Sequence, residues 1–172
     1  MAEISYLHPL AHGKAPAVVR SSTIHCLLLP VEGASVLLPN ASVAEIIPYR
    51  LPEPLADAPP WLLGILSWRE HRVPMVSLES AMGGEAAAAR PTSRIAVLNT
   101  LNGSTRTPYI AVLTQAIPQL RLATEDNVVY DAAAALGAHT ASVAAQVRLN
   151  GEPFVIPDLD DLEQRIERLQ QS

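Results

Sequence analysis

Apolar and polar residues alternate in short stretches along most of the chain, and turn-forming residues separate these stretches about every eight to twelve positions. A two-residue period places successive side chains on opposite faces of a β-strand. Strands are therefore expected over 23–29, 35–38, 46–47, 61–68, 73–78, 94–98, 108–113, 116–122, 142–149 and 154–156. So many short strands predict an all-β barrel or sandwich. The two clearest hairpins, 61–78 and 143–156, predict two barrel-like halves.

The hairpin over 61–78 has the most distinctive pattern. Its first strand, 61–68, is almost wholly apolar, as is typical of a strand buried on both faces. Its second strand alternates, with one face made of Val73, Met75 and Ser77 and the other of Pro74, Val76 and Leu78. Four polar residues lie at the tip between the strands: Arg69, Glu70, His71 and Arg72. A tip of this kind suits a recognition surface and also an ordinary hairpin.

Short helices and loops are expected between the strands. Asn40 is placed to cap one helical turn through Ala44, and another turn of helix is expected over 78–82. Loops are expected over 49–60, 83–91 and 125–137. The prolines of the first loop predict a stiff extended connection, with a proline-rich ligand for another domain as the alternative. In the second loop, 85–90 has enough alanine to be helical instead, and the third also has room for a short helix.

The two ends of the chain differ in pattern. Residues 1–22 show no period and contain Pro9, Gly13 and Pro16, so we expect a flexible leader there and a folded domain over 23–172. The end of the chain predicts a helix over 158–170, capped by Asp158 and carrying an i, i+4 pair of Asp161 and Arg165. Its apolar stripe consists of Leu159, Leu162, Ile166 and Leu169. This narrow stripe fits packing on the barrel, whereas a coiled coil needs more than about two heptads.

Composition narrows the classes of function. The 172 residues are 49% apolar, enough to build one domain or two small subdomains around a shared core. The net charge of -5 and the absence of a basic run argue against a nucleic-acid partner. No apolar run approaches the roughly 20 residues that cross a bilayer, so no direct membrane insertion is expected. The first 20 residues do not read as a secretory signal, and a cytoplasmic protein is expected.

The sequence contains no recognisable catalytic constellation. It has no Gly-x-Ser-x-Gly elbow and no phosphate-cradling glycine loop, and its five histidines are scattered. His8 and His12 have i, i+4 spacing, but Pro9 and Gly13 disfavour the helix that a metal site would need there. Cys26 lies in an apolar strand, where a buried structural thiol is expected. We therefore expect neither an enzyme nor a cofactor or metal.

The order of motifs resembles a known family. Residues 64–70, Gly-Ile-Leu-Ser-Trp-Arg-Glu, and 71–78, His-Arg-Val-Pro-Met-Val-Ser-Leu, are similar to a strand, turn and strand of CheW-like domains from bacterial chemotaxis coupling proteins. In that family the turn is of the type Asn-Leu-Arg-Gly and the next strand of the type Ile-Val-Pro-Val-Ile-Asp-Leu. The strands over 27–47, 95–99 and 110–113, and Ile-Pro-Asp-Leu at 156–159, fit the same order. The resemblance covers about residues 24–169.

The resemblance implies two small SH3-like five-stranded β-barrel subdomains that share a core, with short helices and a C-terminal helix. It implies a non-enzymatic adaptor that binds the regulatory domain of a chemotaxis histidine kinase and the cytoplasmic tip of a methyl-accepting receptor. The family's turn arginine falls on Arg69, so partner binding is expected at Arg69 and Trp68, with Glu70 and His71 beside them. Trp68 is either a core residue or an exposed anchor. The structural alternative for Arg69 is a solvated turn residue.

Three positions depart from the family pattern: Ser67 replaces Asn, Trp68 replaces Leu, and Glu70 replaces Gly. Without glycine the turn must adopt a conformation that a residue with a Cβ tolerates. The carboxylate of Glu70 is expected to mask Arg69 or to change the preferred partner. The chain thus resembles a divergent coupling protein, for which a pilus-associated chemosensory system and a flagellar one are the two alternatives.

Two alternatives to a complete coupling protein are open. A small-ligand sensor on a barrel fold would have a closed pocket of convergent polar groups, near His71 or near Glu125 and Asp126. A degenerate coupling domain would bind only one of the two partners, which is consistent with the altered turn.

Overall fold

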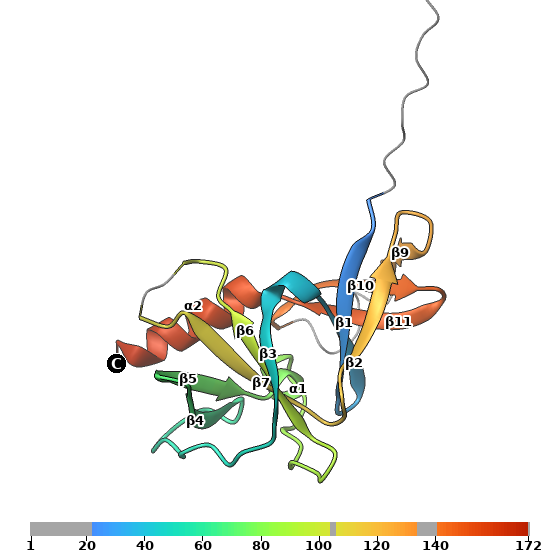
Figure 1. Cartoon of the computed structure of the whole chain (residues 1–172). Helices are drawn as coiled ribbons and strands as arrows, with labels where there is room; N and C mark the ends of the chain where they lie inside the picture. Colours follow the sequence, from blue (N-terminus) through green and yellow to red (C-terminus); the bar gives the residue numbers. More distant parts are fainter. Residues whose placement is uncertain (1–21, 104–105, 134–140, 172) are drawn as a thin grey trace, which may run out of the picture.

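A computed structural model describes residues 22–103, 106–133 and 141–171 (Figure 1). The leader expected over 1–22, with His8 and His12, lies outside the described residues except for Ser22. The segment 125–137, where a short helix was considered, also lies partly outside the described residues. In the described part of the chain, eleven strands form two sheets.

The first sheet contains the first two described strands of the chain and the last four. Its strands lie in the order β8-β1-β2-β11-β10-β9. Their bounds are Gln119–Ala123 (β8), Ile24–Val31 (β1), Ala34–Pro39 (β2), Glu152–Pro157 (β11), Val143–Leu149 (β10) and Val128–Tyr130 (β9). Neighbouring strands are antiparallel except β2 and β11, which pair in parallel where Val155 lies opposite Val36. Asn150 and Gly151 both have positive φ, 51° and 82°, and form the hairpin turn that the sequence predicts there.

The second sheet contains the middle of the chain. Its strands lie in the order β3-β6-β7-β5-β4. Their bounds are Val43–Pro48 (β3), Arg94–Asn99 (β6), Tyr109–Thr114 (β7), His71–Val76 (β5) and Leu62–Trp68 (β4). The strands β3 and β4 are therefore the two edges of this sheet.

The predicted fold class is confirmed: the protein is mostly β, with two SH3-like subdomains and a C-terminal helix (Figure 1). Among the described strands, β9 is a sixth member of the first sheet, in a segment expected to be loop and helix. Val129 and Tyr130 in this strand are both largely exposed. The segment therefore lacks the alternation of buried apolar and exposed polar residues by which a strand is recognised in a sequence.

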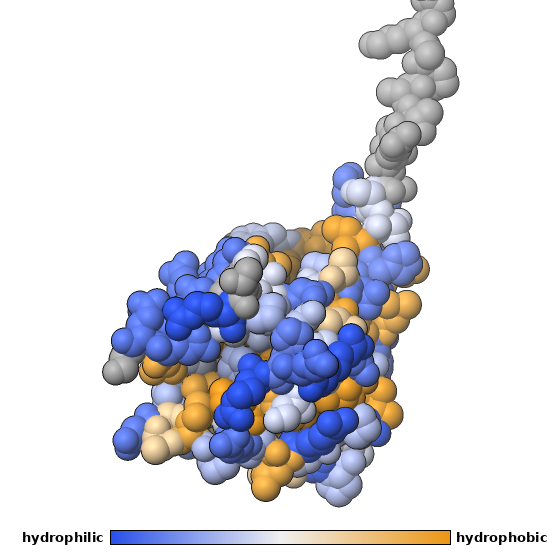
Figure 2. Space-filling view, turned by 60° about the vertical axis from the view of Figure 1, so that its left-hand side comes forward, coloured by the Kyte–Doolittle hydropathy of each residue, from blue (hydrophilic) through white to orange (hydrophobic). Residues whose placement is uncertain are grey.

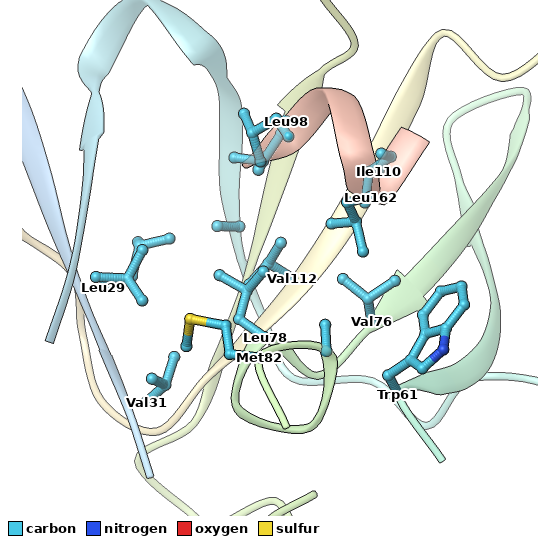
Figure 3. Packing of buried hydrophobic residues seen from close by; sticks show 14 of the residues in the cluster. Leu29, Val31, Trp61, Val76, Leu78, Met82, Leu98, Ile110, Val112 and Leu162 are labelled. Carbon is cyan, nitrogen blue, oxygen red and sulfur yellow. The ribbon is translucent and has the colours of Figure 1, made fainter. Parts of the chain in front are cut away.

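One hydrophobic core lies between the two sheets (Figure 3). It combines Leu29 and Val36 from the first sheet with Val76 and Val112 from the second, and Leu162 of the C-terminal helix closes it. Two smaller clusters fill the individual subdomains, one around Met75 and Val97 and the other around Phe154 and Leu149. Cys26 belongs to the last cluster, and burial raises the pKa of its thiol, as expected for a structural cysteine.

The helices are short apart from the last one. Asn40–Ser42 (η1) is a 3₁₀ turn whose N-cap is Pro39 without a side-chain cap bond, so the predicted capping by Asn40 is wrong. Leu78–Ala81 (α1) is capped by Ser77, whose hydroxyl accepts from the Ser80 N–H. Segment 83–91 is a loop, and the alternative of a helix over 85–90 is wrong.

Leu159–Gln170 (α2) agrees closely with its prediction. The Asp158 carboxylate accepts from the Asp161 N–H at 2.9 Å, and Asp161 pairs with Arg165 at 3.7 Å. The first three residues of the expected apolar stripe are buried in the shared core, whereas Leu169 is exposed near the end of the helix. The helix therefore packs on the barrel, as predicted, and is too short to extend far beyond it.

The burial of the 61–78 hairpin differs from its prediction. The apolar strand β4 alternates between buried and partly exposed positions because it is an edge strand of the second sheet. The second strand, β5, for which the sequence predicted only an alternation between two faces, is buried on both of them from Val73 onward because it lies between β4 and β7. Apolar content alone does not report the position of a strand within its sheet.

The proline-rich loop covers part of the free edge of β4. Glu53 and Ile65 exchange backbone hydrogen bonds of 2.9 and 2.8 Å, which makes an isolated bridge between the loop and the strand. Gly64, next to this bridge, has φ of 140°, and a Cβ there would overlap the Glu53 carbonyl oxygen. The close approach of the loop thus requires glycine at this position.

We expect Gly64→Ala to lower the free energy of unfolding by about 2–4 kcal/mol, because it combines a strained φ with a backbone clash. Gly33→Ala is the matched control, since Gly33 also has positive φ (75°) but open space around it, and about 1 kcal/mol is expected. Urea unfolding of both variants measures the difference. Equal losses would show that the loop yields to the methyl group.

Candidate partner-binding site

Arg69 and Glu70 form a two-residue turn between β4 and β5, and Trp68 lies opposite His71 as the last pair of the hairpin. Backbone φ is positive at Arg69 (50°) and not at Glu70. The turn therefore avoids the left-handed conformation where the family pattern has glycine, as the sequence predicted. The left-handed residue is Arg69 itself, at a cost of about 1 kcal/mol.

A single carboxylate oxygen holds the turn from across the sheet. The Trp68 Nε1–H donates to Glu45 Oε2 at 3.0 Å, and Arg69 Nη2 donates to the same oxygen at 3.1 Å. Glu45 lies on β3 and Trp68 on β4, the two edges of the second sheet. The side chains of Glu45, Trp68 and Arg69 thus link β3 and β4, which no backbone hydrogen bonds join in the described structure. The expected masking of Arg69 by Glu70 is wrong, because the ion pair forms with Glu45.

Trp68 is a core residue rather than an exposed anchor, with only 3% of its surface exposed. Its ring packs edge-on against Tyr109 at 4.9 Å between centroids and stacks with His71 at 6.3 Å. The Arg69 guanidinium carbon lies 4.5 Å from the Trp68 ring centroid, within the range of a cation–π contact. Two contacts therefore hold this guanidinium while 66% of its side chain remains exposed.

The four polar residues of the tip are all exposed, as the sequence predicts. Arg72 pairs with Glu53 at 3.0 Å, an exposed ion pair that fastens the proline-rich loop to β5. The surface consequently presents two cations in fixed places, of which only Arg69 also rests on an aromatic ring. Such a cation suits recognition of a carboxylate on another protein.

Sequence reasoning did not identify Glu45 as part of this site. The signal for it was a lone carboxylate in the apolar stretch Val43 to Ile47. A charge in such a stretch indicates a specific partner, but the sequence does not reveal that the partner lies 23 residues further on, at Trp68.

A small-ligand sensor would have a closed polar pocket near His71 or near Glu125, and the structure has no such pocket at these two described places. His71 is exposed at the start of β5, 5.0 Å from the Tyr109 ring. Glu125 lies beside a mainly aliphatic pocket of about 400 Å³ with Ile24, Cys26 and Val128 in its lining. Within the described residues, no three His, Cys, Asp or Glu side chains lie close enough to hold a metal ion.

Comparisons with known proteins agree with the geometry. The family model described as CheW-like domain matches residues 25–167. Among solved structures, the fold is similar to the scaffolding protein TtCheW from Thermoanaerobacter tengcongensis, with a TM-score of 0.66 at 15% identity. The match covers 79% of this chain and 89% of that one. No curated protein matches this chain in sequence.

Replacing Glu45 with alanine should lower the free energy of unfolding by about 1–3 kcal/mol, because it leaves the buried Trp68 Nε1–H without its acceptor. Glu53→Ala is the matched control, since it removes only the exposed pair with Arg72 and should cost less than about 1 kcal/mol. Thermal and urea unfolding, followed by tryptophan fluorescence, measure both. If the Glu45 variant is as stable as the control, the link between the edges is not structural.

Proposed function

Because the chain belongs to the family of CheW-like domains, we propose that it couples chemoreceptors to a chemotaxis-type histidine kinase as a scaffold. The family model confirms the resemblance found in the sequence and extends over nearly the same residues. It also confirms the non-enzymatic class, since CheW-like domains are adaptors. The partners we propose are the regulatory domain of the kinase and the cytoplasmic tip of a methyl-accepting receptor.

The main support for this partner site is the guanidinium of Arg69, which is fixed by neighbouring side chains and is still exposed to solvent. Contacts with Glu45 and the Trp68 ring already restrict its rotamers, so a partner carboxylate would immobilise it at little further cost in entropy. In this proposal Trp68 acts through Arg69 rather than by touching the partner. Glu70 and His71, both exposed beside Arg69, would form the rim of the interface.

An adaptor needs a second surface, and the edges of the first sheet offer one. Large apolar side chains are exposed on both edge strands: Leu120 and Leu122 on β8, and Val129 and Tyr130 on β9. Figure 2 shows hydrophobic patches between hydrophilic side chains over the face that it presents. A free strand edge with apolar side chains can bind a partner by main-chain pairing and side-chain packing. We propose that this sheet binds one partner and the β4–β5 turn the other.

The cellular setting follows from these partners. A kinase regulatory domain and a receptor tip both lie in the cytoplasm, so we propose that the protein acts there, without nucleic acid and without inserting into a membrane. In the described part of the chain, no helix is long and apolar enough to cross a membrane. The altered turn, with Ser67, Trp68 and Glu70, is the basis for proposing a pilus-associated system that drives twitching motility rather than flagella.

The first experiment is a pull-down of the purified protein with two baits, the kinase regulatory domain and a receptor cytoplasmic hairpin. We expect both baits to bind, and Arg69→Ala to weaken binding to one of them about tenfold, the effect of a moderate hot spot. The variant should unfold within about 1–2 kcal/mol of the wild type, because Arg69 contributes an exposed ion pair with Glu45 and a surface cation–π contact with Trp68.

Arg72→Ala is the matched control, since it removes a neighbouring exposed arginine that is also paired with a glutamate. It should bind both baits nearly as well as the wild type. Binding of a single bait would indicate a degenerate coupling domain. Normal binding by Arg69→Ala would refute the assigned site, and binding of neither bait would refute the coupling function.

A further inference from the structure

A second site lies away from the β4–β5 turn, where the loop after α1 meets the turn between β1 and β2. A pocket of about 440 Å³ opens there, with Glu32, Glu79, Met82, Glu85 and Val155 in its lining. It adjoins a second pocket of about 430 Å³, which shares four lining residues with the first and extends to Asp131. No residue of this groove belongs to the β4–β5 turn or is one of the exposed apolar residues on β8 and β9.

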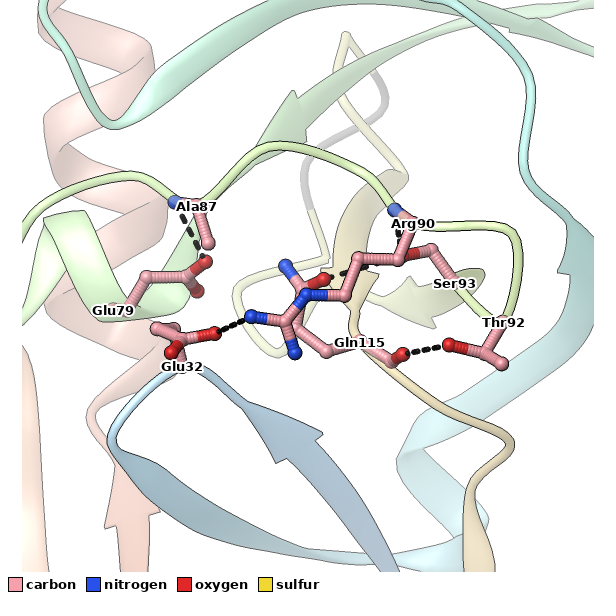
Figure 4. Close-up of polar contacts among 7 residues, drawn as sticks. All are labelled: Glu32, Glu79, Ala87, Arg90, Thr92, Ser93 and Gln115. Atoms are coloured by element: carbon pink, nitrogen blue, oxygen red, sulfur yellow. Dashed lines mark hydrogen bonds and ion pairs between the residues drawn. The ribbon is translucent and has the colours of Figure 1, made fainter.

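Glu79 is the buried acid of this pocket, with only 4% of its surface exposed. The loop after α1 folds over it, because the Gly84 N–H donates to the Glu79 carbonyl at 2.8 Å. The Ala87 N–H of the same loop donates to Glu79 Oε1 at 3.3 Å (Figure 4). The other carboxylate oxygen, Oε2, is buried and has no hydrogen-bond partner among the described residues. A buried carboxylate accepts several hydrogen bonds when it is satisfied, and leaving it unsatisfied is costly.

The charges around the groove do not balance. Four carboxylates line the two pockets: Glu32, Glu79, Glu85 and Asp131. Arg90 pairs with Glu32 and Arg148 pairs with Asp131. Neither Glu79 nor Glu85 has an ion-pair partner in the described part of the chain, so the groove keeps an excess of negative charge.

We propose that this pocket binds a guanidinium or alkylammonium group, with Glu79 Oε2 as its buried acceptor. The cation would donate to the orphaned oxygen and balance its charge, while Glu85 attracts it at the exposed rim. Met82 and Val155 supply an apolar wall for the methylene stem of an arginine or lysine side chain. The adjoining pocket gives room for neighbouring residues of a peptide, so a basic side chain of a partner protein fits the groove better than a free small amine.

Nuclear magnetic resonance titration of the isotope-labelled full chain tests this site. The probes are the peptide acetyl-Ala-Arg-Ala-amide, its neutral counterpart acetyl-Ala-Gln-Ala-amide, and the free diamine putrescine. We expect the arginine peptide to shift the amide signals of Gly33, Gly84 and Ala87 and to bind more tightly than putrescine, whereas the glutamine peptide should have no effect. Equal binding of the peptide and putrescine would support the cation site with a free amine as its ligand.

Glu79→Gln keeps the shape of the side chain and the acceptor for Ala87 but removes the charge, and it should weaken binding of the arginine peptide at least about tenfold. Glu152→Gln is the matched control at an exposed glutamate outside the groove, and it should bind as the wild type does. If Glu79→Gln fails to fold, Glu85→Gln replaces it, with an expected weakening of about two- to threefold. Absence of binding by both cations, or undiminished binding by the glutamine variant tested, would overturn the proposal.

Discussion

The structure depends on one hydrophobic core that neither sheet could enclose alone. Leu29 near the start of the fold and Leu162 near its end meet in this core, and the strands between them supply the rest. Removing this apolar surface from water stabilises contacts between segments far apart in sequence. The two subdomains consequently form a single unit, and neither end of the fold can detach without exposing the shared interior.

The β4–β5 turn is rigid because of this arrangement, although its residues lie at the surface. Val73 and Met75 anchor β5 in the interior, and Trp68 is buried at the end of β4. Glu45 then orients the indole and the guanidinium of Arg69 from the opposite edge of the sheet. An exposed charge is thus positioned by buried neighbours, as in many recognition sites that rest on a stable scaffold.

The sequence predicted local features better than relations across the fold. The strands, the Asn150-Gly151 turn and the Asp158 cap depend on neighbouring residues, and the structure confirms them. The order of strands within a sheet depends on distant pairing, so the sequence did not show that β4 is an edge strand, and the expectation that it is buried on both faces was wrong. Arg69 was found by its place in a motif, whereas Glu45 became recognisable only once β3 and β4 were known to face each other.

The bridge between Glu53 and Ile65 has a consequence for the solubility of the protein. An uncovered, flat edge strand invites identical copies to add to it and so begins aggregation. Prolines in the covering loop cannot donate to a growing ladder, and the Arg72–Glu53 pair keeps the loop in place. The covering loop thereby guards this edge against the addition of strands from other copies of the chain.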